Sequence, residues 1–151
     1  MLLPEIGRRI ATELRSADLV SAGLKRAYYP APAQLVEGPA AIVFAQTGEA
    51  EQFSEQIWHH EVRVQVMTPI MSAQALPAGI NALEPLVMAV WDHFRPNTNA
   101  WRLTVAGEVG QVTHCYPVRY EASQLIIYAG AEYAAIVIDF NVKDHRFAGD
   151  A

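Results

Sequence analysis

The chain has 151 residues, of which 52% are hydrophobic and 18% are charged. This length and composition are typical of a single globular domain over residues 1–151, and they exclude an intrinsically disordered chain. The formal net charge of −5 argues against a dedicated nucleic-acid clamp, because such a clamp needs a basic face.

The first predicted element is a helix over residues 4–17. Pro4 suits a helix start, and apolar residues recur at four-residue spacing in one stripe: Ile6, Ile10 and Leu14. Gly23 is expected to mark the stop. Because charges such as Glu5 and Arg8 fall in this segment, we expect neither a signal peptide nor a membrane span, and a protein that matures in the cytoplasm.

The following segments predict two short strands separated by a proline-rich loop. Residues 24–30 form the first candidate strand, and the apolar run 40–46 predicts a buried one. Residues 47–56 then predict an exposed polar loop or hairpin tip, which carries Glu49, Glu51 and Glu55.

The stretch WHHEVRVQV opens a run of strict alternation over residues 58–67, which predicts a strand with one dry and one wetter face. His59 and His60 therefore point to opposite faces and cannot jointly chelate one metal ion. We expect His60 to be a satisfied, largely buried histidine, with a ligand or proton-transfer role as the alternative. The dry face holds Trp58, His60, Val62, Val64 and Val66, and the wetter face holds His59, Glu61, Arg63, Gln65 and Met67.

Residues 72–94 predict a long helix, because apolar residues follow 3.6-residue spacing throughout. Pro77 fits its first turn, whereas Pro85 removes a backbone hydrogen bond and is expected to kink or split the helix. His93 lies near the end of this helix, where a positive charge interacts favourably with the helix C-terminus.

The last third predicts strands connected at Ala106–Gly107 and at Ala129–Gly130. In the final strand, alternate residues from Ala134 to Val142 face the core, while Asp139 faces out. The ends, 1–3 and 144–151, are expected to be flexible. Helix, strands, long helix and strands in this order predict an α+β fold, with two helices packed on one face of a mostly antiparallel, mixed β-sheet.

Motifs that carry chemistry are scarce. Cys115 is the single cysteine, which excludes an intrachain disulfide, and we expect it to be a small buried apolar residue. The sequence has no zinc-ligand spacing, no phosphate-binding loop and no nucleophile elbow. We therefore expect no enzyme activity, no catalytic residues, no metal and no cofactor. A small ligand-binding module or an enzyme using His60 or His114 is the alternative from another class.

The wetter face of the sheet is the more informative surface. Arg63, Gln65 and Tyr133 lie on it among apolar residues, and partly apolar surfaces usually bind protein. Together with the acidic loop, this face gives the candidate subunit or tube interface: Glu49, Glu51, Glu55, Arg63, Gln65 and Tyr133.

Several segments together resemble the tail terminator, or tail completion, proteins of long-tailed bacteriophages. They are LKRAYYPAPAQLVEGPAAIVF, then a polar loop, WHHEVRVQVMTP, a long helix, and a late strand pair ending YAAIVIDFNV. The resemblance covers residues 5–143 and lies in the helix–strand–strand–helix–strand order and in a Pro-Ala-Ala-apolar segment before the second strand. Pro85 and the loose alignment of the last strands depart from the pattern.

The resemblance implies a structural virion protein, assembled in the host cytoplasm as a homo-hexameric ring. Such a ring caps the tail tube protein and contacts the head–tail connector or head-closure protein, while DNA passes through its pore without sequence-specific binding. No membrane partner is implied. The acidic loop would contact the ring or tube, or face the lumen, where negative charge repels DNA. A head-closure, neck or minor tail protein is the alternative within the virion.

Overall fold

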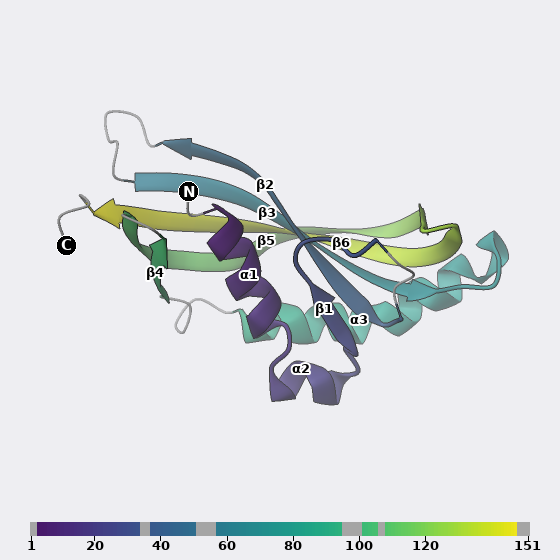
Figure 1. Ribbon diagram of the computed structural model, residues 1–151. Coiled ribbons are helices and arrows are strands. Elements are labelled where there is room, and N and C mark those ends of the chain that lie inside the picture. Colours follow the sequence, from purple (N-terminus) through teal and green to yellow (C-terminus); the bar gives the residue numbers. More distant parts are fainter. Residues whose placement is uncertain (1–2, 34–36, 51–56, 95–100, 106–107, 148–151) are drawn as a thin grey trace.

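The computed structural model describes residues 3–33, 37–50, 57–94, 101–105 and 108–147 (Figure 1). These residues form helices and one sheet, which confirms the predicted α+β class. The elements in chain order are α1 (Leu3–Glu13), α2 (Ala17–Ala22), β1 (Arg26–Tyr28), β2 (Ala40–Ala50), β3 (Ile57–Pro69), the 3₁₀ turn η1 (Ala73–Ala75), α3 (Leu76–His93), β4 (Trp101–Val105), β5 (Glu108–Tyr128) and β6 (Ala131–Phe147).

The sheet has six strands in the order β1-β2-β3-β6-β5-β4. Only β1 and β2 pair in parallel; the other neighbours are antiparallel. The long strands twist so strongly that they cross near the middle of Figure 1, and the helices all lie on one side of them. The predicted arrangement of helices on one face of a mixed sheet is therefore correct.

The main core lies between the helices and this face of the sheet. Alternate residues of β3 and β6 meet the apolar stripes of α1 and α3, as the period-2 and 3.6-residue patterns predict. Each such side chain contributes about 1.5–3 kcal/mol through removal of its surface from water. Members include Ile6, Ile10, Leu14, Val62, Val64, Val66, Leu83, Val87, Val90, Ile136, Ile138 and Phe140.

A second apolar cluster lies on the opposite face, at one end of the sheet. The Tyr128 hydroxyl donates a hydrogen bond to the carbonyl of Pro32, which brings the segment after β1 against this end. The cluster is formed by Ala40, Ile42, Met67, Tyr133 and Ala135, with Tyr28, Phe44 and Tyr128 packed against it. The face without helices is thus closed at one end and open at the other.

Some helix and strand boundaries differ from the predictions, because local backbone conformation or strand pairing determines where these elements end. The first predicted helix is two helices, because Ser16 adopts an extended conformation between α1 and α2. Gly23 ends α2 at φ 115°, as expected of a stop glycine. Residues 47–50 continue β2 instead of forming a loop, because they pair with β3.

Two further predictions concern the continuity of the chain. The C-terminal strand continues to Phe147 instead of becoming flexible at residue 144, because β3 and β5 pair with it on both sides. α3 is continuous through Pro85, so the helix is not split there. Pro85 is exposed, so water can reach the carbonyl of Asn81 that lacks a helical donor. Within the described residues, no helix has the length and apolar character needed to cross a membrane.

Both predicted hairpin connections lie where expected. Val105 pairs with Glu108 across residues 106–107, which are outside the described part of the chain. Tyr128 pairs with Ala131 across Ala129 and Gly130, at φ 49° and 83°. Positive φ at both central residues is the type I′ geometry that matches the twist of paired strands.

Candidate functional site

The open end of the helix-free face holds a groove with a volume of about 900 Å³. It runs over β3, β6 and β5, where the strand alternation turns polar side chains away from the core. Its polar lining consists of His59, His60, Glu61, Arg63, Arg119, Asp139 and Asn141. The groove is therefore a charged surface on a rigid sheet.

Three of the side chains that line this groove form an ion network. Arg63 on β3 and Arg119 on β5 are both register partners of Asp139 on β6. Arg63 Nε donates to Asp139 Oδ1 at 3.1 Å, and Arg119 Nε donates to Oδ2 at 2.6 Å. Burial tends to raise the pKa of Asp139, but hydrogen bonds from Arg119 and Arg63 outweigh it and lower that pKa. The carboxylate thus remains charged and orients both arginines.

The predicted interface residues of the sheet share this face but not the same surroundings. Arg63 is in the groove with 42% of its side chain exposed. Gln65 is half-buried, and its amide lies 3.8 Å from Met67 Sδ. Tyr133 and Met67, expected on an accessible surface, are buried in the second apolar cluster. That expectation was wrong. Alternation predicts which face of the sheet a side chain lies on, but it does not predict whether another segment covers that face.

The predicted acidic residues are only partly placed. Glu49 is in β2 as the register partner of His59, not in a loop. Glu51 and Glu55 lie outside the described residues. The structure therefore brings Arg63 together with Arg119 and Asp139, two residues that sequence reasoning did not assign to the site.

His60 is buried, as predicted, but its environment is not that of a fully satisfied histidine. Its Nε2 contacts the Asp144 carboxylate, which is also buried. Its Nδ1 has no hydrogen-bond partner among the described residues. The ring lies against Gly48, its register partner on β2, where an added Cβ would be 2.6 Å from Nδ1.

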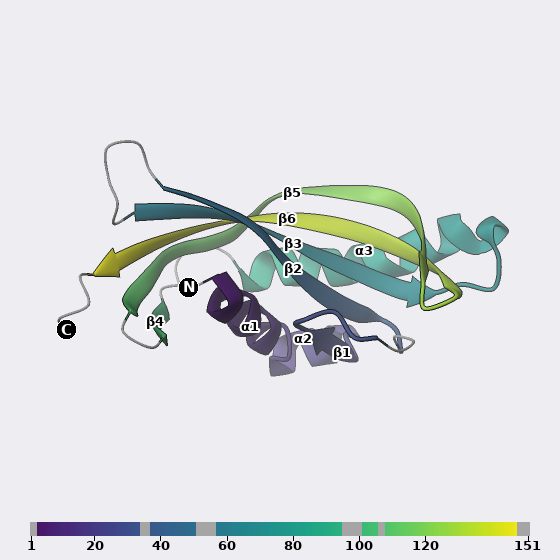
Figure 2. The ribbon, with the colours of Figure 1, turned by 45° about the horizontal axis from the view of Figure 1, so that its top comes forward.

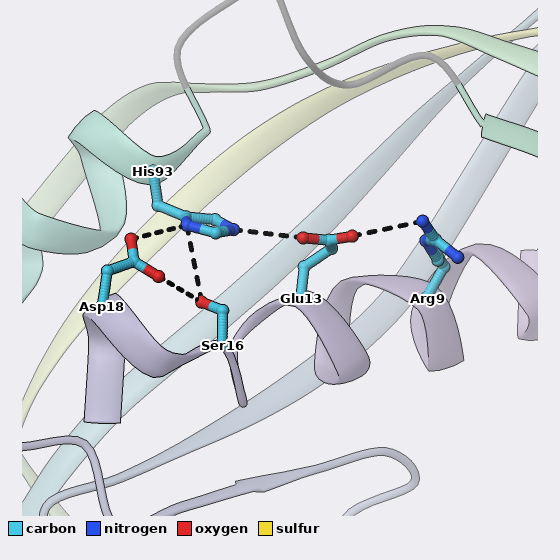
Figure 3. Close-up of polar contacts among 5 residues, drawn as sticks. All are labelled: Arg9, Glu13, Ser16, Asp18 and His93. Atoms are coloured by element: carbon cyan, nitrogen blue, oxygen red, sulfur yellow. Dashed lines mark hydrogen bonds and ion pairs between the residues drawn. The ribbon is translucent and has the colours of Figure 1, made fainter. Parts of the chain in front are cut away.

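A second histidine joins the ends of three helices (Figure 3). His93 Nδ1 lies 2.8 Å from Asp18 Oδ2, and His93 Nε2 lies 3.1 Å from Glu13 Oε2. Arg9 reaches the other oxygen of Glu13 at 3.2 Å. Each ring nitrogen therefore has a carboxylate oxygen within hydrogen-bond distance. The sequence predicts that His93 lies at a helix end, but it does not predict which residues contact it.

The remaining polar groups offer little chemistry. Cys115 is buried, as expected, and burial, with a smaller effect of Glu13, raises the pKa of its thiol. His114 is exposed, and its strand position turns it away from the face that Cys115 occupies. In the described ranges, no group of three or more His, Cys, Asp or Glu residues is placed to hold a metal ion.

No protein-family model matches the chain, and no curated protein matches it. The resemblance to tail terminators therefore stays a prediction that rests on the sequence pattern.

Proposed function

We propose that this protein is a structural virion protein that forms a ring, terminates a phage tail tube and joins it to the head connector. The observation that carries the proposal is the division of the sheet: helices pack one face, and the other presents a charged groove. Such a scaffold suits contact with other proteins. The observed order of two helices, three strands, a long helix and three strands contains the helix–strand–strand–helix–strand order on which the resemblance rests, with further elements added.

The groove supports recognition of a protein partner. Arg63 and Arg119 use Nε to contact Asp139, and no described residue bonds to their terminal nitrogens. These nitrogens are oriented donors for carboxylate or backbone carbonyl groups, a use for which arginine is favoured at interfaces. The partners in this proposal are further copies of the chain, the tail tube protein and the connector.

The first test is the mass of the assembled protein. Sedimentation velocity over a range of concentrations should show a species near six subunits, or the protein should be hexameric on isolated tails. A protein that is monomeric in solution and also on tails would remove the ring from the proposal.

The second test is complementation of a phage that lacks this gene. Reversal of Glu49, Glu51 and Glu55 to Lys should change folding stability by no more than about 0.5 kcal/mol, because the sequence predicts that these side chains are exposed and exposed charge changes have small effects. It should impair assembly, because like charges against a partner cost several kcal/mol. Glu84→Lys on the exposed side of α3 is the matched control.

Electron microscopy of the particles separates the possible contacts. Overlong tails would indicate lost capping, and normal tails without heads would indicate a lost connector contact. Full infectivity of the triple variant would exclude the acidic segment as an interface and leave the groove around Arg63 as the better candidate. A head-closure or minor tail protein would instead leave tail length unchanged in every variant.

One observation favours a second class of function. A groove of about 900 Å³ with converging polar groups has the size of a small-molecule site. A ligand-binding module or enzyme is therefore the competing proposal. Saturable binding of a small molecule that Arg119→Ala abolishes, in a protein that never assembles, would favour it.

A further inference from the structure

Two stretches of the sheet have a strand partner on one side only within the described residues. β4 pairs with Glu108–Val112 of β5, and β1 pairs with Ala40–Ile42 of β2. Figure 2 shows these short strands beside the much longer ones. We call residues 116–128 of β5 the β5 edge and residues 43–50 of β2 the β2 edge.

The β5 edge exposes several large hydrophobic side chains. Edge strands of native proteins normally carry charges or prolines that prevent pairing with other chains. This edge has Pro117, Arg119 and Glu121, but it also carries four large exposed hydrophobic side chains: Val118 (50%), Tyr120 (53%), Leu125 (42%) and Ile127 (75%). Clustered exposure of this kind marks a binding surface.

A helix extends this apolar surface. Tyr120, Leu125 and Ile127 lie on the helix side of the sheet, as their register partners show. Trp91 of α3 packs edge-on against Tyr120 with ring centroids 6.1 Å apart. Met88, one turn earlier on α3, is 51% exposed. The surface therefore spans the strand edge and the adjacent flank of α3.

We propose that the β5 edge of one copy pairs with the β2 edge of a second copy, head to tail, and so continues the sheet from subunit to subunit. This inference rests on the proposed function, because it takes the ring as the assembly. A head-to-tail contact uses two different surfaces and closes into a ring when its rotation permits.

Strand direction supports this partner. β2 is antiparallel to β3, β3 to β6, and β6 to β5, so β2 and β5 run in opposite directions. A second copy in the same orientation therefore brings its β2 antiparallel to β5, the more stable type of pairing. Within one copy the registers align residues 43–50 of β2 with residues 112–120 of β5, so the second copy is also displaced along the strands until its β2 edge faces residues 120–127. Its α1, which packs against β2, then lies on the helix side of the joined sheet.

The irregularities of the β5 edge limit the strength of this pairing. The register shifts between Pro117 and Arg119 and again between Glu121 and Gln124. Bulges twist a strand edge and interrupt its ladder, and Pro117 has no N–H to donate. Short paired segments give a weak contact, which suits subunits that associate fully only at the end of a tube.

Hydrogen exchange on the full chain tests the proposal. Amides in both edges should exchange at least tenfold more slowly in the assembled protein, or in rings mounted on tails, than in dilute monomer. Ile127→Lys should weaken self-association at least tenfold. Val20→Lys, at a residue 56% exposed on α2, is the matched control and should leave it unchanged. Leu125→Lys is the second variant if Ile127→Lys does not fold.

The outcomes separate this inference from the proposed function. Protection of the β5 edge alone would indicate symmetric pairing of two β5 strands and would overturn the head-to-tail arrangement. A ring with protection elsewhere, or with the affinity of Ile127→Lys unchanged, would overturn the inference but not the ring. Wild-type protein that assembles neither in solution nor on tails would overturn both.

Discussion

The two histidine–carboxylate sites of this protein use the same chemical groups in opposite surroundings. His60 and Asp144 are 1% and 0% exposed and connect two strands of the core. His93 is 17% exposed and contacts Glu13 and Asp18, of which the second is 58% exposed. One site is dry and has one carboxylate for two ring nitrogens; the other is partly hydrated and has two.

This difference decides what each site contributes. A buried pair repays the removal of both groups from water only when its remaining hydrogen bonds are made, and Nδ1 of His60 makes none among the described residues. We therefore expect the pair to act on which strands and registers can pair, because any arrangement that separates His60 from Asp144 leaves the imidazole buried without this partner. The His93 site keeps contact with water, so we expect it to hold the ends of the helices together and to contribute only modestly to the free energy of unfolding.

The largest effect should follow from breaking the dry site. Asp144→Ala should lower the free energy of unfolding by about 3–5 kcal/mol, because it leaves His60 buried without its partner. Loss of a buried polar residue alone predicts that His60→Ala lowers the free energy of unfolding by roughly 1–3 kcal/mol. Because the Asp144 carboxyl group then loses its contact with His60, we expect a loss at or above the upper end of this range. Urea denaturation measures both.

The matched control replaces both groups together. His60→Leu with Asp144→Val should be close to neutral, since apolar residues of similar volume often replace a buried pair without loss. A loss below about 1 kcal/mol for Asp144→Ala alone would contradict this account of the pair. Stoichiometric zinc in wild-type protein that disappears in His60→Ala would instead show a metal ligand.

The contact between His60 and Gly48 should give the next largest effect. Gly48→Ala places a Cβ 2.6 Å from His60 Nδ1, so the ring or the strand must shift. Overpacking of this kind costs about 1–3 kcal/mol. In the His60→Ala background the same change should cost nothing. An equal loss in both backgrounds would show that the strain comes from the backbone of β2.

Breaking the partly hydrated site should have a smaller effect. His93→Ala should lower stability by about 1–2 kcal/mol, because it removes charge-assisted hydrogen bonds that remain partly in water. His93→Gln keeps an N–H donor group but can carry no positive charge, and its loss of stability should fall between those of wild type and His93→Ala. Hydrogen exchange at the ends of α2 and α3 should rise more than in β3; uniform destabilisation would argue against a local clamp.

The smallest effect should appear only in acid. The hydrogen bond from Ser16, followed by His93, lowers the pKa of Asp18 below its ordinary value of 3.8. A lowered native pKa contributes stability above the unfolded-state value, and this contribution is lost as the pH falls through the native value. Asp18→Asn should therefore lose less stability than wild type when the pH drops from about 5 to about 2.

Urea midpoints at several pH values measure this difference. Ser16→Ala, which removes the largest cause of the shift, should behave as an intermediate. Parallel acid curves for wild type and Asp18→Asn would show that Asp18 does not feel these partners in solution.

The sequence by itself determined the fold class and the faces of the long strands. Alternation over residues 58–67 places His60 with the core and Arg63 away from it, because successive side chains of a strand point to opposite sides. The same rule predicts that the side chains of Cys115 and His114 lie on opposite faces of their strand. Four-residue spacing identifies the buried stripe of α1 in the same way. These are local properties of the backbone, so a short window of sequence contains them.

Only the tertiary structure decided what each face meets. The partner of His60 is 84 residues away, and the two arginines of the groove converge on Asp139 through the registers of separate strand pairs. Tyr133 follows the alternation but is buried, because a distant segment covers its end of the face. Register and cover depend on contacts between segments far apart in the chain, and local periodicity carries no information about them.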